Sequence, residues 1–214
     1  MTETIRLKSG EAQLARKALE RCVSGGGVAV FPSDGLYGLA CDPLDATAIE
    51  RIHRVKGRDD GKPSAVMYFS PLAMRELVET LGPRTRKAVG ALLPGPVTLV
   101  VANPQRRYPL ACRENPERLG VRLIAGPLAG AICPVFQTSA NRSGEPPPSG
   151  FEDVPPEILE ATDLAIDGGK LTGLPSTVVD LTAFDGAGEW DVLREGAFSQ
   201  VDLAARLVGI VAGP

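Results

Sequence analysis

Cationic and polar side chains gather beside glycine in short segments of this chain, and their types suit an anionic ligand. Lys56-Gly57-Arg58, followed by Lys62, places three cations within seven residues, which is enough to hold a polyanion such as a triphosphate. A solvated basic patch is the competing interpretation. Thr138-Ser139-Ala140-Asn141 packs hydroxyls and an amide into one turn that can bind phosphate oxygens, a sugar or a base edge, although an ordinary Ser/Thr turn looks similar.

Further hydroxyl and cationic side chains stand close to predicted strand ends. Ser33 and Tyr37 belong to a glycine-containing segment, Phe31 to Leu39, that can hold a small polar ligand against a sheet; a glycine-rich turn explains the same residues without a ligand. Ser176 opens a predicted strand and Arg194 closes another, so each is either a site residue or a strand boundary. Because α/β folds place ligands at strand ends, we expect these segments to share one site.

Several familiar catalytic motifs are absent from the sequence. It contains no G-x-x-x-x-G-K-[ST] phosphate loop, no G-x-G-x-x-G after a strand, no H-E-x-x-H and no G-x-S-x-G. We predict a structural or surface role for the single histidine, His53. The cysteines lie far apart without a C-x-x-C pair, so they predict small buried residues and neither a zinc site nor a disulfide framework: Cys22, Cys41, Cys112 and Cys133.

Composition bounds the class of protein. The 214 residues are 43% hydrophobic and 23% charged, which predicts a soluble globular protein with a core, and we expect one α/β domain over residues 1–214. The net charge of −3 argues against a protein whose whole surface binds nucleic acid, while a local basic cleft is compatible with it. No apolar run reaches the length of a signal peptide or a membrane span, so we expect a cytoplasmic protein without a membrane partner.

Hydrophobic periodicity predicts the elements that must position these residues. Glu11 to Val23 has the period of an amphipathic helix, and Val28 to Phe31 is an apolar run typical of a buried strand, with a loop from Ser33 to Gly38. Asp45 can cap a helix that ends at Lys56. Further runs predict strands at 65–69, 97–101, 120–124, 135–139 and 177–181, and helices at 71–80 and 84–93. The alternation of strands and helices indicates a twisted α/β sheet.

Seven of these segments, in this order, resemble the YrdC-type family of threonylcarbamoyl-AMP synthases. The motifs are F-P-S-D-G-L-Y-G-L, K-G-R, P-G-P-V-T-L-V, G-V-R, T-S-A-N-R-S-G, P-S-T-V-V-D and R-E-G, which span about residues 26–196. The resemblance implies a single domain around a twisted, largely mixed sheet flanked by helices, with a concave basic cleft. It also implies the short, stand-alone form without the extra C-terminal domain of the longer family branch.

The activity that this resemblance implies joins L-threonine, bicarbonate and ATP into threonylcarbamoyl-adenylate and pyrophosphate, usually with Mg²⁺. Other proteins then transfer the threonylcarbamoyl group to tRNA. Two alternatives stay open: a module that binds double-stranded RNA or tRNA, and a paralogue that acts on another carbamoylated substrate. Proximity and electrostatic stabilisation would carry the reaction, because no residue of the motifs is an evident nucleophile.

The resemblance also implies roles for individual residues. Catalysis at the ATP phosphates would fall to Lys56 and Arg58, and no residue is expected to be a dedicated metal ligand. The rest of the ATP site would consist of Lys62, Thr138, Ser139, Asn141, Ser149 and Arg194. Arg122 would pair with the threonine carboxylate, with Ser33, Tyr37 and Ser176 lining the same end.

The chain departs from the family pattern at the amino-acid end. Relatives usually have Thr, then Glu or Asp, then Thr, where this chain has Ser33-Asp34-Gly35 and so loses a methyl and one hydroxyl. Met67 stands where longer relatives often carry a histidine, and residues 123–126 intervene before Pro127. Strict specificity for threonine is therefore a weaker expectation than the use of ATP.

Overall fold

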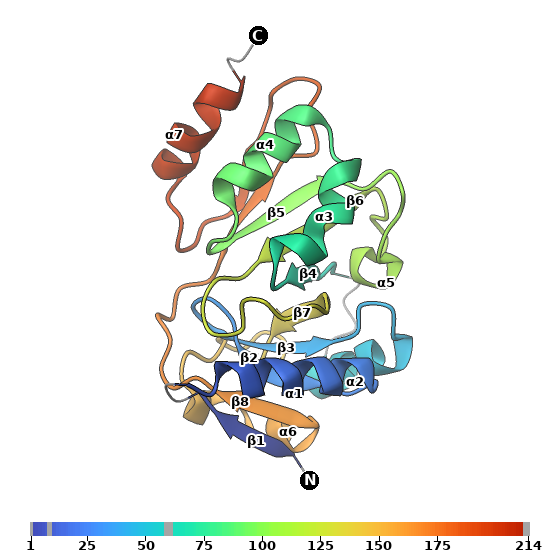
Figure 1. The fold of residues 1–214 in the computed structure, drawn as a ribbon, viewed down its shortest axis with the longest axis vertical. Coiled ribbons are helices and arrows are strands. Elements are labelled where there is room, and N and C mark those ends of the chain that lie inside the picture. Colours follow the sequence, from blue (N-terminus) through green and yellow to red (C-terminus); the bar gives the residue numbers. More distant parts are fainter. Residues whose placement is uncertain (1, 8–9, 58–61, 212–214) are drawn as a thin grey trace.

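One mixed β-sheet runs through the residues that the computed structural model describes, 2–7, 10–57 and 62–211 (Figure 1). Its strand order is β1-β8-β2-β3-β7-β4-β6-β5-β9-β10. The strands are β1 (Glu3–Arg6), β2 (Ala29–Pro32), β3 (Tyr37–Cys41), β4 (Ala65–Tyr68), β5 (Val97–Ala102), β6 (Arg118–Leu123), β7 (Val135–Ser139), β8 (Leu164–Asp167), β9 (Thr177–Asp180) and β10 (Asp191–Arg194). Pairing is parallel between β4 and β6 and antiparallel between β5 and β6, which confirms the predicted mixed α/β sheet.

Helices cover both faces of this sheet. Their bounds are α1 (Ala12–Ser24), α2 (Ala46–Lys56), α3 (Pro71–Thr80), α4 (Pro83–Leu92), α5 (Pro109–Cys112), α6 (Pro156–Glu160) and α7 (Gln200–Val211), with a 3₁₀ turn at Phe151–Asp153. Buried residues of α1 form one hydrophobic cluster with β2, while α2, α3, α4, α6 and α7 contribute to a larger one. Figure 1 shows α1 beside the lower half of the sheet and α3 and α4 beside the upper half.

The helix predicted after Asp45 has the expected ends. The Asp45 carboxylate accepts hydrogen bonds from the main-chain N–H groups of Thr47 and Ala48, at 2.9 and 3.0 Å. Gly57 ends the helix in the left-handed conformation, with φ of 60°. These caps place Lys56 in the last turn, next to the segment that follows β7.

The predicted loop from Ser33 to Gly38 is shorter than expected, because Tyr37 and Gly38 open strand β3. The main-chain N–H of Ser33 donates to the carbonyl of Leu36 at 3.0 Å, which closes a tight turn between β2 and β3. Pro32 and Tyr37 then face each other in antiparallel register. Proline and two glycines within eight residues look like a loop in the sequence, but here they build a hairpin.

Strands β1 and β8 were not predicted from the sequence. Each has four residues, and β1 buries only Ile5, so neither carries a long periodic signal. Strand β8 lies between β1 and β2 and pairs with both in parallel. The amino-terminal edge of the sheet therefore depends on a strand from the second half of the chain.

His53 and the cysteines have structural surroundings. His53 is buried, with its ring 5.9 Å from the ring of Phe136 and its nitrogens close to the guanidinium of Arg113, which confirms its structural role. The four cysteines are free thiols, and burial raises the pKa of Cys22 and of Cys133 to about 11. None of the described helices is long and apolar enough to cross a bilayer.

Candidate functional site

A hollow of about 550 Å³, which we call the first cavity, opens on one face of the sheet. Strands β4 to β7, β9 and β10 and the turn after β2 contribute residues to it. Two small residues that pair in register, Ala65 of β4 and Gly120 of β6, leave room for the cavity above the sheet. A Cβ atom at Gly120 would lie 3.5 Å from the Cα atom of Ala65, in ordinary contact, so a larger side chain would fill the hollow.

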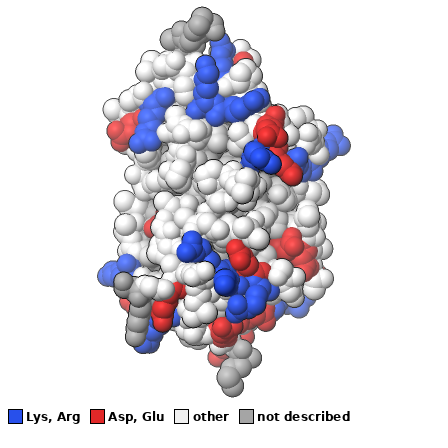
Figure 2. Space-filling model, viewed as in Figure 1, with Lys and Arg blue, Asp and Glu red and all other residues white. Residues whose placement is uncertain are grey.

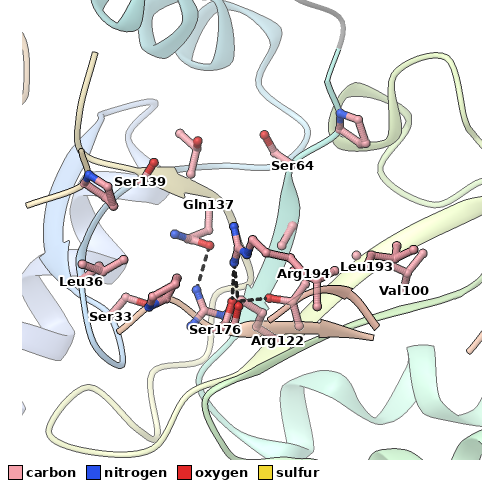
Figure 3. A pocket seen from close by; sticks show the side chains of 18 of the residues that line it. Ser33, Leu36, Ser64, Val100, Arg122, Gln137, Ser139, Ser176, Leu193 and Arg194 are labelled. Atoms are coloured by element: carbon pink, nitrogen blue, oxygen red, sulfur yellow. Dashed lines mark hydrogen bonds between the residues drawn. The ribbon is translucent and has the colours of Figure 1, made fainter. Parts of the chain in front are cut away.

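Three buried side-chain atoms of residues that line this cavity have no hydrogen-bond partner. They are Ser33 Oγ, Ser64 Oγ and Arg122 Nε, and they are the only such side-chain atoms in the part of the chain that the structure describes. Because an unpaired buried donor or acceptor costs roughly 1–3 kcal/mol, native proteins rarely leave one without a purpose. Three around a single cavity indicate a ligand site. Figure 3 shows Ser33, Ser64 and Arg122 around it.

Arg122 is a buried cation of this lining. The residue is only 6% exposed. Its guanidinium forms an ion pair with Asp34 and donates from Nη1 to Gln137 Oε1 at 3.1 Å. Burial raises the pKa of Asp34 and the neighbouring Arg122 partly offsets that rise. Arginine stays charged in proteins, so the free Nε of Arg122 is a fixed cationic donor.

A second arginine of this lining is held by Ser176. Arg194 Nη2 donates to the main-chain oxygen of Ser176 at 2.8 Å and to its Oγ at 3.1 Å. That hydroxyl also lies 2.8 Å from Thr98 Oγ1. Burial lowers the pKa of Arg194. Figure 3 shows Arg194, Ser176, Arg122 and Gln137 converging on one region of the cavity.

Lys56 and Asn141 join helix α2 to the turn after β7. Lys56 Nζ donates to the main-chain oxygen of Ser139, to the main-chain oxygen of Asn141 at 2.7 Å and to Asn141 Oδ1 at 3.3 Å. Asn141 Nδ2 donates to the main-chain oxygens of Arg142 and Glu145, at 2.9 and 2.6 Å. Both residues are buried beside the cavity and outside its lining, so they fix the position of Ser139.

Residues 168–175, which we call the strap, cross one end of the cavity. The Tyr37 hydroxyl donates to the oxygen of Gly169 at 2.7 Å and accepts from the N–H of Gly168 at 2.9 Å. The main-chain oxygen of Ser149 accepts from the N–H of Leu171 at 2.7 Å. Tyr37 belongs to the cavity lining and its hydroxyl anchors the strap, while Ser149 holds the strap through its main-chain oxygen.

The lining of the first cavity carries positive charge. It contains Lys62, Arg118, Arg122 and Arg194 and, among the described residues, no acidic side chain. Two of these cations have carboxylate partners behind them, Asp180 for Arg118 and Asp34 for Arg122. On the face drawn in Figure 2, cationic and acidic side chains are interspersed. The lining of the first cavity is positive, and a broad basic cleft stays a prediction.

The structure brings most of the predicted site residues together. Those that line the first cavity are Ser33, Tyr37, Lys62, Arg122, Thr138, Ser139, Ser176 and Arg194. Lys56 and Asn141 lie beside it, Ser149 lies behind the strap, and Arg58 falls outside the described residues. Sequence reasoning missed several polar residues of the lining, among them Ser64, Thr98, Arg118 and Gln137. Two-residue spacing is the signal that could have found two of them, because Gln137 shares a strand face with Ser139 and Arg118 shares one with Arg122.

Comparison with known proteins gives consistent matches. The family model described as telomere recombination, for Sua5, YciO and YrdC proteins, matches residues 21–196. The threonylcarbamoyl-AMP synthase of Nitrosococcus oceani is 34% identical over 168 residues, covering 75% of this chain and 89% of that protein. The synthase of Methylobacillus flagellatus is 34% identical over 174 residues, covering 77% and 94%.

Solved structures agree with the family match. E. coli YciO is 27% identical, with a TM-score of 0.77 and coverage of 93% of this chain and 97% of that one. P. abyssi Sua5 complexed with L-threonine is 25% identical, with a TM-score of 0.79 and coverage of 96% of this chain. This chain spans 60% of the length of that Sua5 chain.

Proposed function

We propose, from the premise that this chain belongs to the Sua5, YciO and YrdC family, that it converts L-threonine, bicarbonate and ATP into threonylcarbamoyl-AMP and pyrophosphate. The observation that carries the proposal is the group of unpaired buried atoms on residues that line the first cavity, Ser33 Oγ, Ser64 Oγ and Arg122 Nε. A substrate rich in carboxylate and phosphate oxygens would supply the missing partners.

Arg122 marks the amino-acid end in this proposal. Its Nε is the unpaired donor of a charged guanidinium, and a carboxylate is the ligand that forms the strongest hydrogen bonds to it. Ser33, Tyr37 and Ser176 line the cavity with it. The Sua5 relative solved with L-threonine supports an amino acid as one of the substrates.

The nucleotide end would use the turn after β7 together with the cations of the lining. Thr138 and Ser139 would contact the nucleotide, with Lys56, Asn141 and Ser149 holding the surrounding main chain. Lys62 and Arg194 line the cavity and would attract the phosphates. Arg58 at the phosphates stays a prediction from the family motif.

Positioning and charge would carry the chemistry. Threonine takes up bicarbonate with loss of water to give a carbamate, and a carbamate oxygen attacks the α-phosphorus in line. The bond from that phosphorus to the bridging oxygen breaks, and pyrophosphate leaves with the electron pair. Cations near the leaving group would stabilise its charge. Mg²⁺ in proteins is usually held by carboxylates together with phosphates, and the described lining offers no carboxylate, so no step is assigned to a metal.

The product would pass to proteins that transfer the threonylcarbamoyl group to tRNA, in the cytoplasm. A module that only binds tRNA is less well supported, because the chain has a net charge of −3 and its charges are interspersed on the face of Figure 2. The first test is therefore pyrophosphate release by purified protein with ATP and bicarbonate, with and without L-threonine. Release that depends on threonine supports the synthase, and a tRNA gel shift without release contradicts it.

Arg122→Lys tests the assignment of the amino-acid end. Lysine keeps a positive charge beside Asp34 but loses the planar fork, so we expect the KM for threonine to rise about tenfold to a hundredfold with little change in the KM for ATP. Arg118→Lys is the matched control, because Arg118 also lines the cavity and also pairs with a carboxylate, that of Asp180. Equal changes in both variants would remove the special role of Arg122.

A further inference from the structure

A second cavity of about 560 Å³ lies on the other side of the turn after β2. Its lining is largely apolar, with leucine, isoleucine, proline and alanine side chains, and Asp34 is its only charged residue among those described. Three residues line both cavities, Ser33, Gly35 and Leu174. These three form the wall between the two spaces.

Main-chain contacts close this wall. The N–H of Gly173, in the strap, donates to the oxygen of Gly35 at 2.9 Å. A Cβ atom at Gly35 would lie 2.1 Å from the oxygen of Leu174 and 2.6 Å from Thr172 Oγ1, so only glycine allows this close approach. The space that a side chain of residue 35 would need is filled by the strap. The side chain of Leu174, which is 54% exposed, is thus the part of the wall that can be trimmed without a change in the main chain.

The wall stands next to the proposed carboxylate anchor. Arg122 lines the first cavity, and its ion-pair partner Asp34 lines the second. A substrate carboxylate on Arg122 would therefore hold the α-carbon of the amino acid close to the boundary. The side chain of that amino acid would then either fit within the first cavity or extend past the wall into the second cavity.

We propose that Leu174, seated against Gly35, sets the size limit for the substrate amino acid. Short side chains such as that of threonine stay within the first cavity, and longer apolar side chains are excluded because the wall separates them from the apolar second cavity. This inference rests on the proposed function, since it takes the first cavity to be the amino-acid site. A steric wall of this kind discriminates by roughly 10- to 200-fold for one methylene group.

Leu174→Ala tests the wall, and Leu193→Ala is its control. Leu193 is 51% exposed and lines only the first cavity. The measurements are pyrophosphate release and calorimetric binding with L-threonine, L-isoleucine and L-leucine. In Leu174→Ala we expect the ratio of kcat/KM for threonine over leucine to fall at least about tenfold, through gained activity with leucine. In Leu193→Ala we expect no change in that ratio.

The two proposals fail in different ways. If the wild type releases pyrophosphate with threonine and Leu174→Ala keeps the wild-type ratio, the wall is wrong and the synthase stands. If both variants change the ratio equally, the wall is also wrong. If the wild type shows no threonine-dependent release, the synthase is wrong, and calorimetry then decides the wall: gained binding of leucine only in Leu174→Ala supports it, and no gain overturns it.

Discussion

The surroundings of Arg122 and those of Lys56 contain similar polar residues, but the first region has buried atoms without hydrogen-bond partners and in the second Lys56 donates to three oxygens. Around Arg122, a charged donor and two serine hydroxyls are buried without partners and line a cavity. Around Lys56, the ammonium donates to three oxygens of the turn after β7, and Asn141 holds the rest of that turn. Both regions belong to motifs of the family, yet only the first has unmet hydrogen-bonding capacity.

The difference separates two tasks that a polar motif residue can perform. Unpaired donors make a fold less stable and gain a partner when a ligand binds, which is the signature of a binding site. Fully engaged groups stabilise the fold and determine where neighbouring groups lie. Lys56 thus fixes the position of Ser139 in this fold, whereas Arg122 keeps a donor without a protein partner.

The largest effect is expected from Lys56→Met. Methionine has a similar length but no donor, so the buried oxygens of Ser139 and Asn141 lose a charged partner, and we expect the free energy of unfolding to fall by about 3 kcal/mol. Guanidinium denaturation measures this change. In Lys62→Met the same substitution at an exposed position of the lining should change stability by less than about 0.5 kcal/mol while raising the KM for ATP. Wild-type stability in Lys56→Met would erase the contrast between the two regions.

A smaller effect is expected from Gly35→Ala. The added Cβ would lie 2.1 Å from the Leu174 oxygen, so the strap must shift and we expect a loss of about 2 kcal/mol in the free energy of unfolding. Gly90→Ala is a sharp control, because Gly90 lies in α4 with nothing within 4 Å of its Cβ position, and alanine should stabilise that helix by about 0.5–1 kcal/mol. Changes of the same sign in the two variants would show that the strap is not packed as described.

The smallest effect is expected from Tyr37→Phe, and it depends on pH. The hydroxyl has two main-chain partners, so its removal should cost about 1 kcal/mol at pH 8. Burial raises the pKa of Tyr37 from 10.0 to about 12. The folded state therefore keeps the phenolic proton where the unfolded state loses it, and this stabilisation, complete below pH 10, disappears as the pH rises toward 12. The stability difference between wild type and variant should narrow over that interval in urea denaturation; a constant difference would contradict the assigned environment.

Local signals made part of this molecule predictable. Helix α2 carries a periodic pattern and caps, and strand β7 is a short apolar run. Strand-end reasoning expected Ser139, Ser176 and Arg194 to lie together, and all three line the first cavity. The length of the loop before Tyr37 was wrong because its composition suits both a loop and a hairpin. The ion pair of Arg122 with Asp34 joins residues 88 positions apart, and no spacing rule predicts such a contact.

The direction of a side chain also escapes sequence reasoning. Lys56 and Lys62 look equivalent in a cationic segment, but Lys56 is buried against a turn and Lys62 lies in the cavity lining. Lys56 is the last residue of helix α2 and Gly57 caps that helix, so the helix determines the direction of Lys56 and has no influence on Lys62. The sequence shows that Gly35 lacks the hydroxyl of the threonine that relatives usually have there. It does not show that the strap fills the space of the missing side chain.

The insertion of β8 between β1 and β2 has a consequence for biosynthesis. Residues 3–6 and 29–32 leave the ribosome long before residues 164–167, with which they pair. At ordinary elongation rates the delay is on the order of ten seconds. During that time the edge of β2 that pairs with β8 has no partner, and the first cavity, which also needs residues of β9 and β10, can form only late in translation.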